Sequence, residues 1–504
     1  MTPEQIADPS MGVSTATTRH QPSSHHEPLS RPRLGVMSLV FLIIAASAPL
    51  TVLAGGAPTA YGVTGVLGVP VGYIILGAVL GLFAIGYGAM SAHIRNAGAF
   101  YAYIAAGLGV RQGIGAAVLA LVAYNLMQVG LYGIFGFSLG MFLETLVGVS
   151  VPWWIAALAG WIIVGALGVN RVDLSVKVVA VLVTLEFLAV VGVDLLSLGV
   201  APEGVTAAPV APSAVFVPGV GAMLACGIAA FMGFESGAVY AEETREPERT
   251  VPRATFVAVG IIACFYAFST WALAIGVGPG QIVARSAELG PDLIFVLLGE
   301  HMNPWVVNFA NLLFITSLLA ALMAFHNAAS RYFYALGRTG VLPRVFGRAN
   351  ARNGAPTVGS LTQSAVAFVV VTVFALAGQN SPDGPLFPVN TLFVWFTNAA
   401  AFGLVFLMLI TSLAVIGFFR GSKEVGLMTR LVAPALSALG LMVIFGLILA
   451  NFDILIGTGS PVLITVMPGI IIAAGIVGLL RGEYLRRTRP SVFREAAEDL
   501  DTPL

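Results

Sequence analysis

Long runs of apolar residues, separated by short polar segments, make up most of this 504-residue chain. Twelve runs are long enough to cross a bilayer core, about 30 Å thick, as α-helices. They fall at 36–60, 69–92, 112–146, 152–168, 172–198, 217–241, 254–278, 304–337, 357–377, 389–418, 430–451 and 460–480. The pattern therefore predicts an all-α membrane protein with twelve transmembrane helices.

The basic residues are distributed unevenly over the segments between these spans. With the N-terminus inside the cell, Arg285 is the one Lys or Arg that falls in an external segment. Lys and Arg accumulate on the cytoplasmic side of membrane proteins. We therefore expect a multi-pass protein of the cell (plasma) membrane with both termini cytoplasmic. Residues 1–33 lack the basic segment followed by an apolar segment that marks a signal peptide, and we expect them to form a disordered tail. Residues 481–504 are expected to form a second cytoplasmic tail.

Composition narrows the class of function. Hydrophobic residues make up 58% of the chain, and the formal net charge is zero, so we expect a lipid bilayer and no nucleic acid as partner. Cys226 and Cys264 lie in apolar runs, which predicts neither a disulfide framework nor a metal site, and no cofactor is expected. The sequence presents no nucleophile–base pair, nucleotide loop or repeated filter motif, so a transporter is favoured over a membrane-embedded enzyme or a channel.

Two spans are interrupted at corresponding places. The sixth contains FMGFESG at 231–237, and the first contains Ser-Ala-Pro-Leu-Thr at 47–51. Paired interruptions of this kind indicate an inverted-repeat transporter with a site near the membrane midplane. We expect one repeat over 34–198, spans 1–5, and a second over 217–420, spans 6–10. Spans 11 and 12, over 430–480, would be appended.

An interrupted helix has chemistry that suits a small zwitterion. One half-helix ends in free carbonyl groups and the next begins with free N–H groups, which carry opposite partial charges. Glycines let the backbone approach a ligand closely, and a mid-membrane carboxyl group needs water, a partner or a substrate. A proline kink with glycine packing is the alternative. The candidate substrate-binding residues here are Ser47, Ala48, Pro49, Leu50, Thr51, Phe231, Gly233, Glu235 and Ser236.

Three segments resemble a known family. FMGFESGAVYAEETREPERTVPRAT is similar to the sixth-span signature of the amino acid–polyamine–organocation superfamily. GAMSAHIRNAGAFYAYIAAGLG (88–109) and YALGRTGVLPRVF (334–346) resemble its span 2–3 and span 8–9 stretches. The resemblance, over residues 34–420, implies a leucine-transporter-like 5+5 fold, alternating access and an amino acid or amine as cargo. Pro49 departs from the glycine-rich first break of the family and cannot donate to a carboxylate.

Further candidates lie in other spans. Asn125 and Gln128 share a face of span 3 and would either border the cavity or bridge helices. Phe325 falls where a related exchanger family has a substrate-capping tryptophan, and Asn398 lies in span 10. All four are candidate substrate-binding residues.

Glu186 lies in the middle of span 5. The Ser-Val-Lys-Val stretch that begins at Ser175 resembles a family motif. In that motif a proton-coupling lysine lies eleven residues after the serine, and Glu186 lies eleven residues after Ser175. It is therefore the candidate ion-coupling residue, with a helix-packing role bonded to span 1 or span 8 as the alternative. The sequence thus predicts a secondary active importer coupled to protons. The alternatives are coupling to sodium and an exchanger without ion coupling.

Overall fold

The computed structural model describes residues 34–94, 100–170, 176–238, 244–350, 354–422, 425–457 and 460–501. Within these ranges the regular elements are helices, and a single β-bridge joins Leu34 to Thr244. The helices are α1 (Val36–Ser47), η1 (Thr51–Gly56), α2 (Ala57–Thr64), α3 (Val69–His93), α4 (Phe100–Leu108), α5 (Val110–Val147), α6 (Trp153–Asn170), α7 (Val176–Val200), η2 (Ala208–Val210), α8 (Pro212–Val215), α9 (Val220–Phe231), η3 (Phe234–Ala238), α10 (Pro247–Val277), α11 (Ile282–Leu289), η5 (Gly290–Asp292), α12 (Leu293–His301), α13 (Pro304–Arg338), η6 (Arg344–Gly347), α14 (Thr357–Ala377), η7 (Gly378–Asn380), η8 (Gly384–Leu386), η9 (Val389–Phe393), α15 (Val394–Phe418), η10 (Met428–Val432), α16 (Ala433–Ala450), α17 (Phe452–Ile456), α18 (Pro461–Thr488) and α19 (Pro490–Asp501).

The predicted membrane spans are present. Eleven helical segments in the described part of the chain are long and apolar enough to cross a bilayer. The remaining predicted span, the sixth, is the interrupted one, and its helical part α9 is too short to cross alone. The chain is thus an all-α membrane protein with twelve transmembrane helices. The predicted tail over 1–33 lies outside the described residues.

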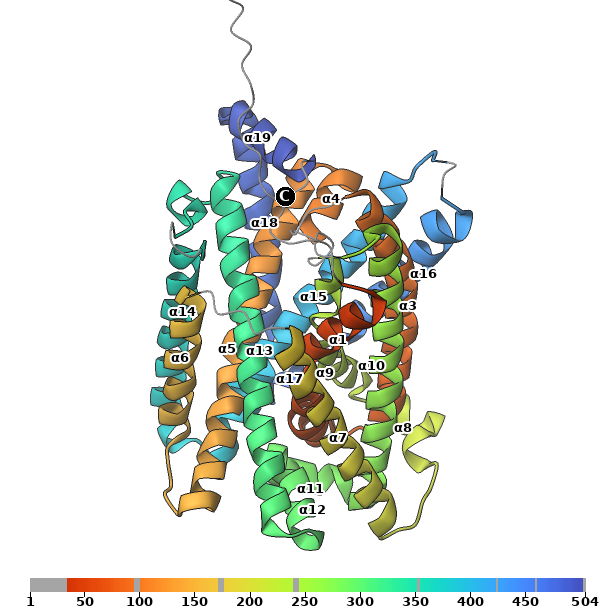
Figure 1. Ribbon diagram of the computed structural model, residues 1–504, viewed down its shortest axis with the longest axis vertical. Coiled ribbons are helices and arrows are strands. Elements are labelled where there is room, and N and C mark those ends of the chain that lie inside the picture. The colour runs from red at the N-terminus through yellow and green to blue at the C-terminus, as the bar shows by residue number, and fades with distance from the viewer. Residues whose placement is uncertain are drawn as a thin grey trace, which may run out of the picture.

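The interrupted helices lie inside the bundle. Figure 1 shows α1 and α9 between the pair α5 and α13 on one side and the pair α3 and α10 on the other. Within these pairs, α13 packs on α5 and α10 packs on α3. Helices α4 and α19 mark one end of the molecule, the α19 end, while α11 and α12 mark the opposite, α11 end.

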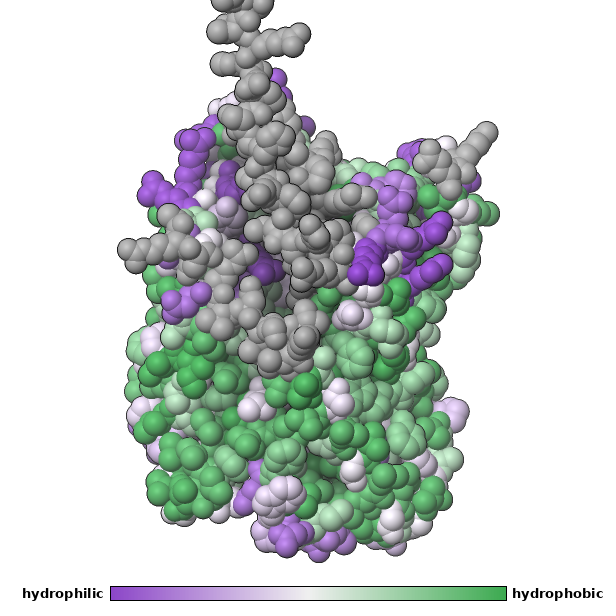
Figure 2. Space-filling model, in the orientation of Figure 1, coloured by the Kyte–Doolittle hydropathy of each residue, from purple (hydrophilic) through white to green (hydrophobic). Residues whose placement is uncertain are grey.

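Apolar side chains cover much of the outer surface. Figure 2 shows a broad hydrophobic surface, with hydrophilic residues gathered toward the α19 end. Large exposed apolar residues occur on the peripheral helices, among them Leu188 on α7, Val369 on α14 and Leu439 on α16. A soluble monomer rarely exposes so continuous an apolar surface, whereas lipid accommodates it.

The segment that follows the last predicted span is helical up to residue 501. Helix α18 continues past residue 480 to Thr488, and α19 follows it. Glu483 pairs with Arg486 and Arg487, one turn further on, at 2.8 and 2.6 Å, which stabilises the helical turn. Arg481 donates to the carbonyl of Val341 at 3.0 Å. The Arg481 contact joins the end of α18 to the loop that follows α13.

Candidate functional site

The first span is interrupted at Ala48. Helix α1 ends at Ser47, and Ala48 has φ 48° and ψ 76°, in the left-handed region. This conformation is strained for a residue with a Cβ atom, but the following Pro49 cannot continue the hydrogen-bonding of α1. Ser47 Oγ donates to the carbonyl of Ile44 at 2.9 Å, so one carbonyl freed by the interruption gains a local donor.

The sixth span is interrupted at Met232 and Gly233. Helix α9 ends at Phe231, Gly233 has φ +104°, and η3 begins at Phe234. A Cβ atom on Gly233 would lie 2.7 Å from the Cβ of Ala46, so the backbone of this break contacts the end of α1. Glycine is required here because both the dihedral angle and the space exclude a side chain. The predicted pair of interruptions therefore meets in space.

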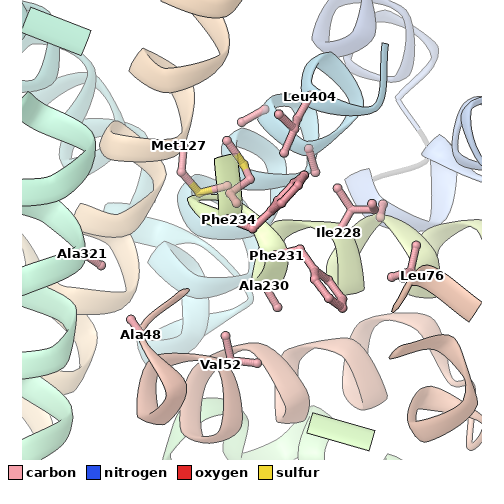
Figure 3. Close-up of a cluster of buried hydrophobic side chains, with 14 of the residues drawn as sticks. Ala48, Val52, Leu76, Met127, Ile228, Ala230, Phe231, Phe234, Ala321 and Leu404 are labelled. Carbon is pink, nitrogen blue, oxygen red and sulfur yellow. The ribbon is translucent and has the colours of Figure 1, made fainter. Parts of the chain in front are cut away.

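A cavity of about 70 Å³ lies beside the two interruptions. Figure 3 shows Ala48 and Val52 of the first span facing Ala230, Met127 and Ala321 from three other helices. None of the described residues that line this cavity is charged. The lining residues are Ala46, Ser47, Ala48, Thr51, Val52, Gly56, Thr59, Met127, Leu131, Cys226, Ala229, Ala230, Met232, Ala321, Phe325, Phe393, Thr397 and Asn398.

The structure brings only some of the predicted residues to this cavity. Ser47, Ala48, Thr51, Phe325 and Asn398 line it. Phe231 instead packs against Tyr73, with ring centroids 6.3 Å apart, and in Figure 3 it lies near Leu76 and Ile228. The predicted residues that are not part of the lining are Pro49, Leu50, Asn125, Gln128, Phe231, Gly233 and Glu235; Ser236 lies in η3, and its side chain is outside the described residues.

Glu235 is engaged by its own span and by two neighbouring helices. One carboxylate oxygen accepts the hydroxyl of Tyr124, and the other accepts the backbone N–H of Gly233 at 2.9 Å. The Tyr87 hydroxyl donates to the backbone carbonyl of Glu235 at 3.1 Å. Glu235 is 4% exposed, so its membrane cost is offset by these donors rather than by water.

Gln128 bridges helices. Its Oε1 accepts from Gln363 Nε2 of α14 at 2.6 Å, and its Nε2 donates to the Tyr132 hydroxyl at 3.0 Å. Asn125 donates to the carbonyl of Leu121 within α5, at 2.7 Å. The two residues are three apart, but the described contacts direct neither into the cavity. Of the two predicted roles for this face of span 3, Gln128 shows the bridging one.

Glu186 reaches the first interruption from α7. Its Oε2 accepts the backbone N–H of Leu50 at 3.2 Å. The neighbouring Thr51 hydroxyl is 2.9 Å from the hydroxyl of Ser317 on α13, and Ser317 also lies within hydrogen-bonding reach of the Glu186 carboxyl group. Glu186 thus joins α7 to the first span and to α13, the contacts predicted for its packing role.

Several lining residues were missed from the sequence. Thr59, Thr397 and Cys226 are polar or polarisable positions in otherwise apolar runs. Thr397 adjoins the predicted Asn398, and Cys226 lies before the sixth-span break on the same helix. Polar positions close to an interruption would have indicated them. The apolar Met127 and Phe393 carry no such signal.

A second cavity, of about 230 Å³, lies between α2, α11, η9 and α17, toward the α11 end. Thr59 lines both cavities. On the other side of the break, an aromatic layer joins α3, α4 and η3; it consists of Phe83, Tyr87, Phe100, Tyr103 and Phe234. Its members are 0–1% exposed. In the described ranges, no cluster of three or more His, Cys, Asp or Glu residues could hold a metal ion.

Comparison with known proteins agrees with this architecture. The model of a family described as amino acid permease matches residues 34–480. The cadaverine/lysine antiporter of Escherichia coli is 29% identical over 157 residues, 31% of this chain and 34% of that protein. The branched-chain amino acid permease BcaP of Lactococcus lactis is 31% identical over 152 residues, 29% of this chain and 30% of that protein.

A third relative is the low-affinity putrescine importer PlaP of E. coli, which is 25% identical over 142 residues, 28% of this chain and 30% of that protein. The matched part spans about a third of the length of each of these relatives. The family match, in contrast, runs from before the first interruption to the last span. The chain belongs to the amino acid permease family of the amino acid–polyamine–organocation superfamily.

Proposed function

We propose that this protein is a secondary active transporter that imports a small amino acid or organic amine across the cell membrane by alternating access, with both termini cytoplasmic. The observation that carries the proposal is the cavity beside two helix interruptions that contact each other at Ala46 and Gly233. Non-helical backbone at membrane depth is tolerated where it is buried in protein or lines a cavity. The names of the relatives, which include amino acids, cadaverine and putrescine, support this class of cargo.

Alternating access is supported by barriers on both sides of the cavity. Toward the α11 end, Thr59 separates it from the second cavity. Toward the α19 end lie the aromatic layer and the buried Glu235–Tyr124 pair. With the α19 end placed in the cytoplasm by the positive-inside rule, the second cavity becomes an external vestibule. Substrate would pass from it into the central cavity and leave through the aromatic layer.

Proton coupling through Glu186 is part of the proposal. This carboxyl group contacts Leu50 and Ser317, which belong to elements that must move when the cavity opens. Protonation would weaken its bond to the Leu50 N–H, and so bias one state over the other. Tyr266 of α10, which hydrogen-bonds Ser47 at 2.8 Å, is a second titratable side chain facing this region.

The chain's two cysteines provide the test. Cys226 lines the cavity, whereas Cys264 is exposed on α10. In a Cys264→Ser background, a small methanethiosulfonate reagent should label Cys226, and a transported compound should slow the labelling. The probes are leucine, lysine, putrescine, cadaverine and 3-methylbutylamine.

The matched control is Cys226→Ser, in which any labelling of Cys264, which is exposed in the middle of the α10 span, should proceed at a rate that ligand leaves unchanged. A compound that protects Cys226 and is also taken up by proteoliposomes supports the proposal. If no probe protected Cys226 or entered proteoliposomes, the proposal would be overturned.

A further inference from the structure

The first amide group that follows the first interruption is already occupied. Pro49 has no N–H group, so the first backbone donor of the second half of span 1 is Leu50. This N–H donates to Glu186 Oε2 at 3.2 Å. The free N–H groups at the start of a helix attract carboxylates because they carry positive partial charge. Here the chain supplies that carboxylate itself, from α7.

The sixth span shows the same arrangement. The N–H of Gly233, at the start of its second part, donates to Glu235 Oε2 at 2.9 Å. Glu235 is buried and also accepts the Tyr124 hydroxyl. Both interruptions therefore have an internal carboxylate on the first backbone amide of the second part of the span.

Several polar side chains that line the cavity also have a donor in use. Thr59 Oγ1 donates to Gly55 O and Thr397 Oγ1 to Phe393 O, each at 2.7 Å. Ser47 Oγ donates to Ile44 O, and Asn398 Nδ2 donates to Val394 O at 2.8 Å. These groups present oxygen acceptors to the cavity. Among the described contacts, Asn398 Oδ1 has no hydrogen-bond partner although Asn398 is 2% exposed.

The backbone adds negative partial charge at the same place. The C-terminal ends of α1 and α9, at Ser47 and Phe231, lie at the two interruptions. Ala46, Ser47, Ala229 and Ala230, from the last turns of these helices, line the cavity. The carboxyl ends of helices favour cations. The cavity therefore combines unfilled acceptors with negative helix ends, and it offers few donors.

We infer that Glu186 is a specificity-determining residue: its carboxylate occupies the Leu50 N–H and excludes the carboxylate of a substrate, so that the cavity takes an organic ammonium without a carboxylate. The inference rests on the proposed function. A zwitterion would place its carboxylate near hydroxyl oxygens whose protons are donated elsewhere, which compensates poorly for its lost hydration. A primary amine needs only acceptors, and Asn398 Oδ1 and the carbonyls at the end of α1 supply them.

The test compares an amino acid with its decarboxylated amine: leucine with 3-methylbutylamine, and lysine with cadaverine. Apparent affinities come from protection of Cys226 against labelling in the Cys264→Ser background. The protein with its native Glu186 should favour the amine of each pair. Glu186→Ala frees the Leu50 N–H, so the ratio of amine to amino-acid affinity should fall about tenfold or more, as expected for one charge-assisted hydrogen bond.

Two further variants make the result specific. Asp194→Ala removes another buried carboxyl group of α7, which accepts from Ser269 at 2.8 Å and does not line the cavity; the ratio should stay unchanged. Glu186→Asp draws the carboxylate back by one methylene and should produce a smaller fall, so it carries the test if Glu186→Ala does not fold.

The outcomes separate the inference from the proposed function. If no probe binds the wild-type cavity, the proposed function fails. If probes bind but the wild-type protein favours the amino acid, the function stands and the inference is overturned. The same holds if the wild-type protein, Glu186→Asp and Glu186→Ala all give the same ratio. A fall in the ratio on substitution of Glu186 but not of Asp194 supports the inference.

Discussion

Gly233 lies so close to Ala46 that a Cβ atom at Gly233 would be 2.7 Å from the Cβ of Ala46. The two residues belong to different interrupted spans, and they meet through van der Waals contact. Their contact sets the separation of the two breaks, and it leaves no room for adjustment because Gly233 also has a positive φ of 104°.

Gly233→Ala should therefore abolish uptake. The new methyl group must push α1 away, and overpacking costs about 1–3 kcal/mol, with about 1–2 kcal/mol more for the left-handed backbone. Thermal unfolding in detergent and uptake by proteoliposomes would measure both effects. Gly260→Ala, at an exposed position of α10 with no atom within 4 Å of the new Cβ, should leave both unchanged. Wild-type uptake by Gly233→Ala would contradict this account of the breaks.

Asn398→Leu should weaken ligand binding while the protein stays folded. The substitution removes the unpartnered Oδ1 from the cavity wall, and a hydrogen bond to a charged group contributes about 1.5–3 kcal/mol. The expected loss of affinity is about 10- to 150-fold, measured by Cys226 protection. Asn125→Leu is the matched control, because Asn125 bonds within its own helix and is not part of the lining. Equal losses in the two variants would argue against Asn398 as a ligand.

The Gln128–Gln363 hydrogen bond should stabilise the fold without affecting substrate selectivity. Gln363→Leu leaves Gln128 Oε1 buried without its 2.6 Å partner, which should lower the free energy of unfolding by about 1–3 kcal/mol. Gln128→Leu with Gln363→Leu should cost less than the sum of the single changes, because both polar groups are then gone. Denaturation of the four proteins would measure the coupling, and additive effects would show that the bond contributes nothing.

Glu186→Gln should uncouple transport from the proton gradient. If protonation of Glu186 drives import, uptake rises as the external pH falls and needs no sodium. The glutamine amide mimics the protonated acid, and its oxygen can still accept from Leu50. Gradient-driven accumulation should therefore fall to equilibrium levels, while exchange of substrate persists. Uptake by proteoliposomes with imposed proton or sodium gradients measures both effects. A sodium requirement for transport, or full proton-driven accumulation by Glu186→Gln, would refute the coupling role of Glu186.

The helix interruptions could be predicted from the sequence because their causes are local. Pro49 and Gly233 act on their own backbone, so an isolated stretch of sequence reveals them. The twelve spans follow from apolar length for the same reason. The direction of a side chain around its helix depends instead on distant partners.

Glu235 illustrates this limit. It turns toward Tyr124, more than one hundred positions earlier in the chain, and toward its own Gly233 amide. Gln128 and Asn125 are close neighbours on α5, yet one crosses to α14 and the other bonds to its own helix. Apolar lining residues such as Met127 cannot be told from core residues, because the same side chain serves both settings.

The barriers on the two sides of the cavity differ in composition, and this difference has a thermal consequence. Toward the α11 end the partition includes Thr59, whereas toward the α19 end five buried aromatic rings pack together. Separating apolar rings increases the heat capacity of the transition state, but moving one threonine hardly changes it. An Eyring plot of release toward the α19 end should therefore be curved, and that of entry from the α11 end nearly straight.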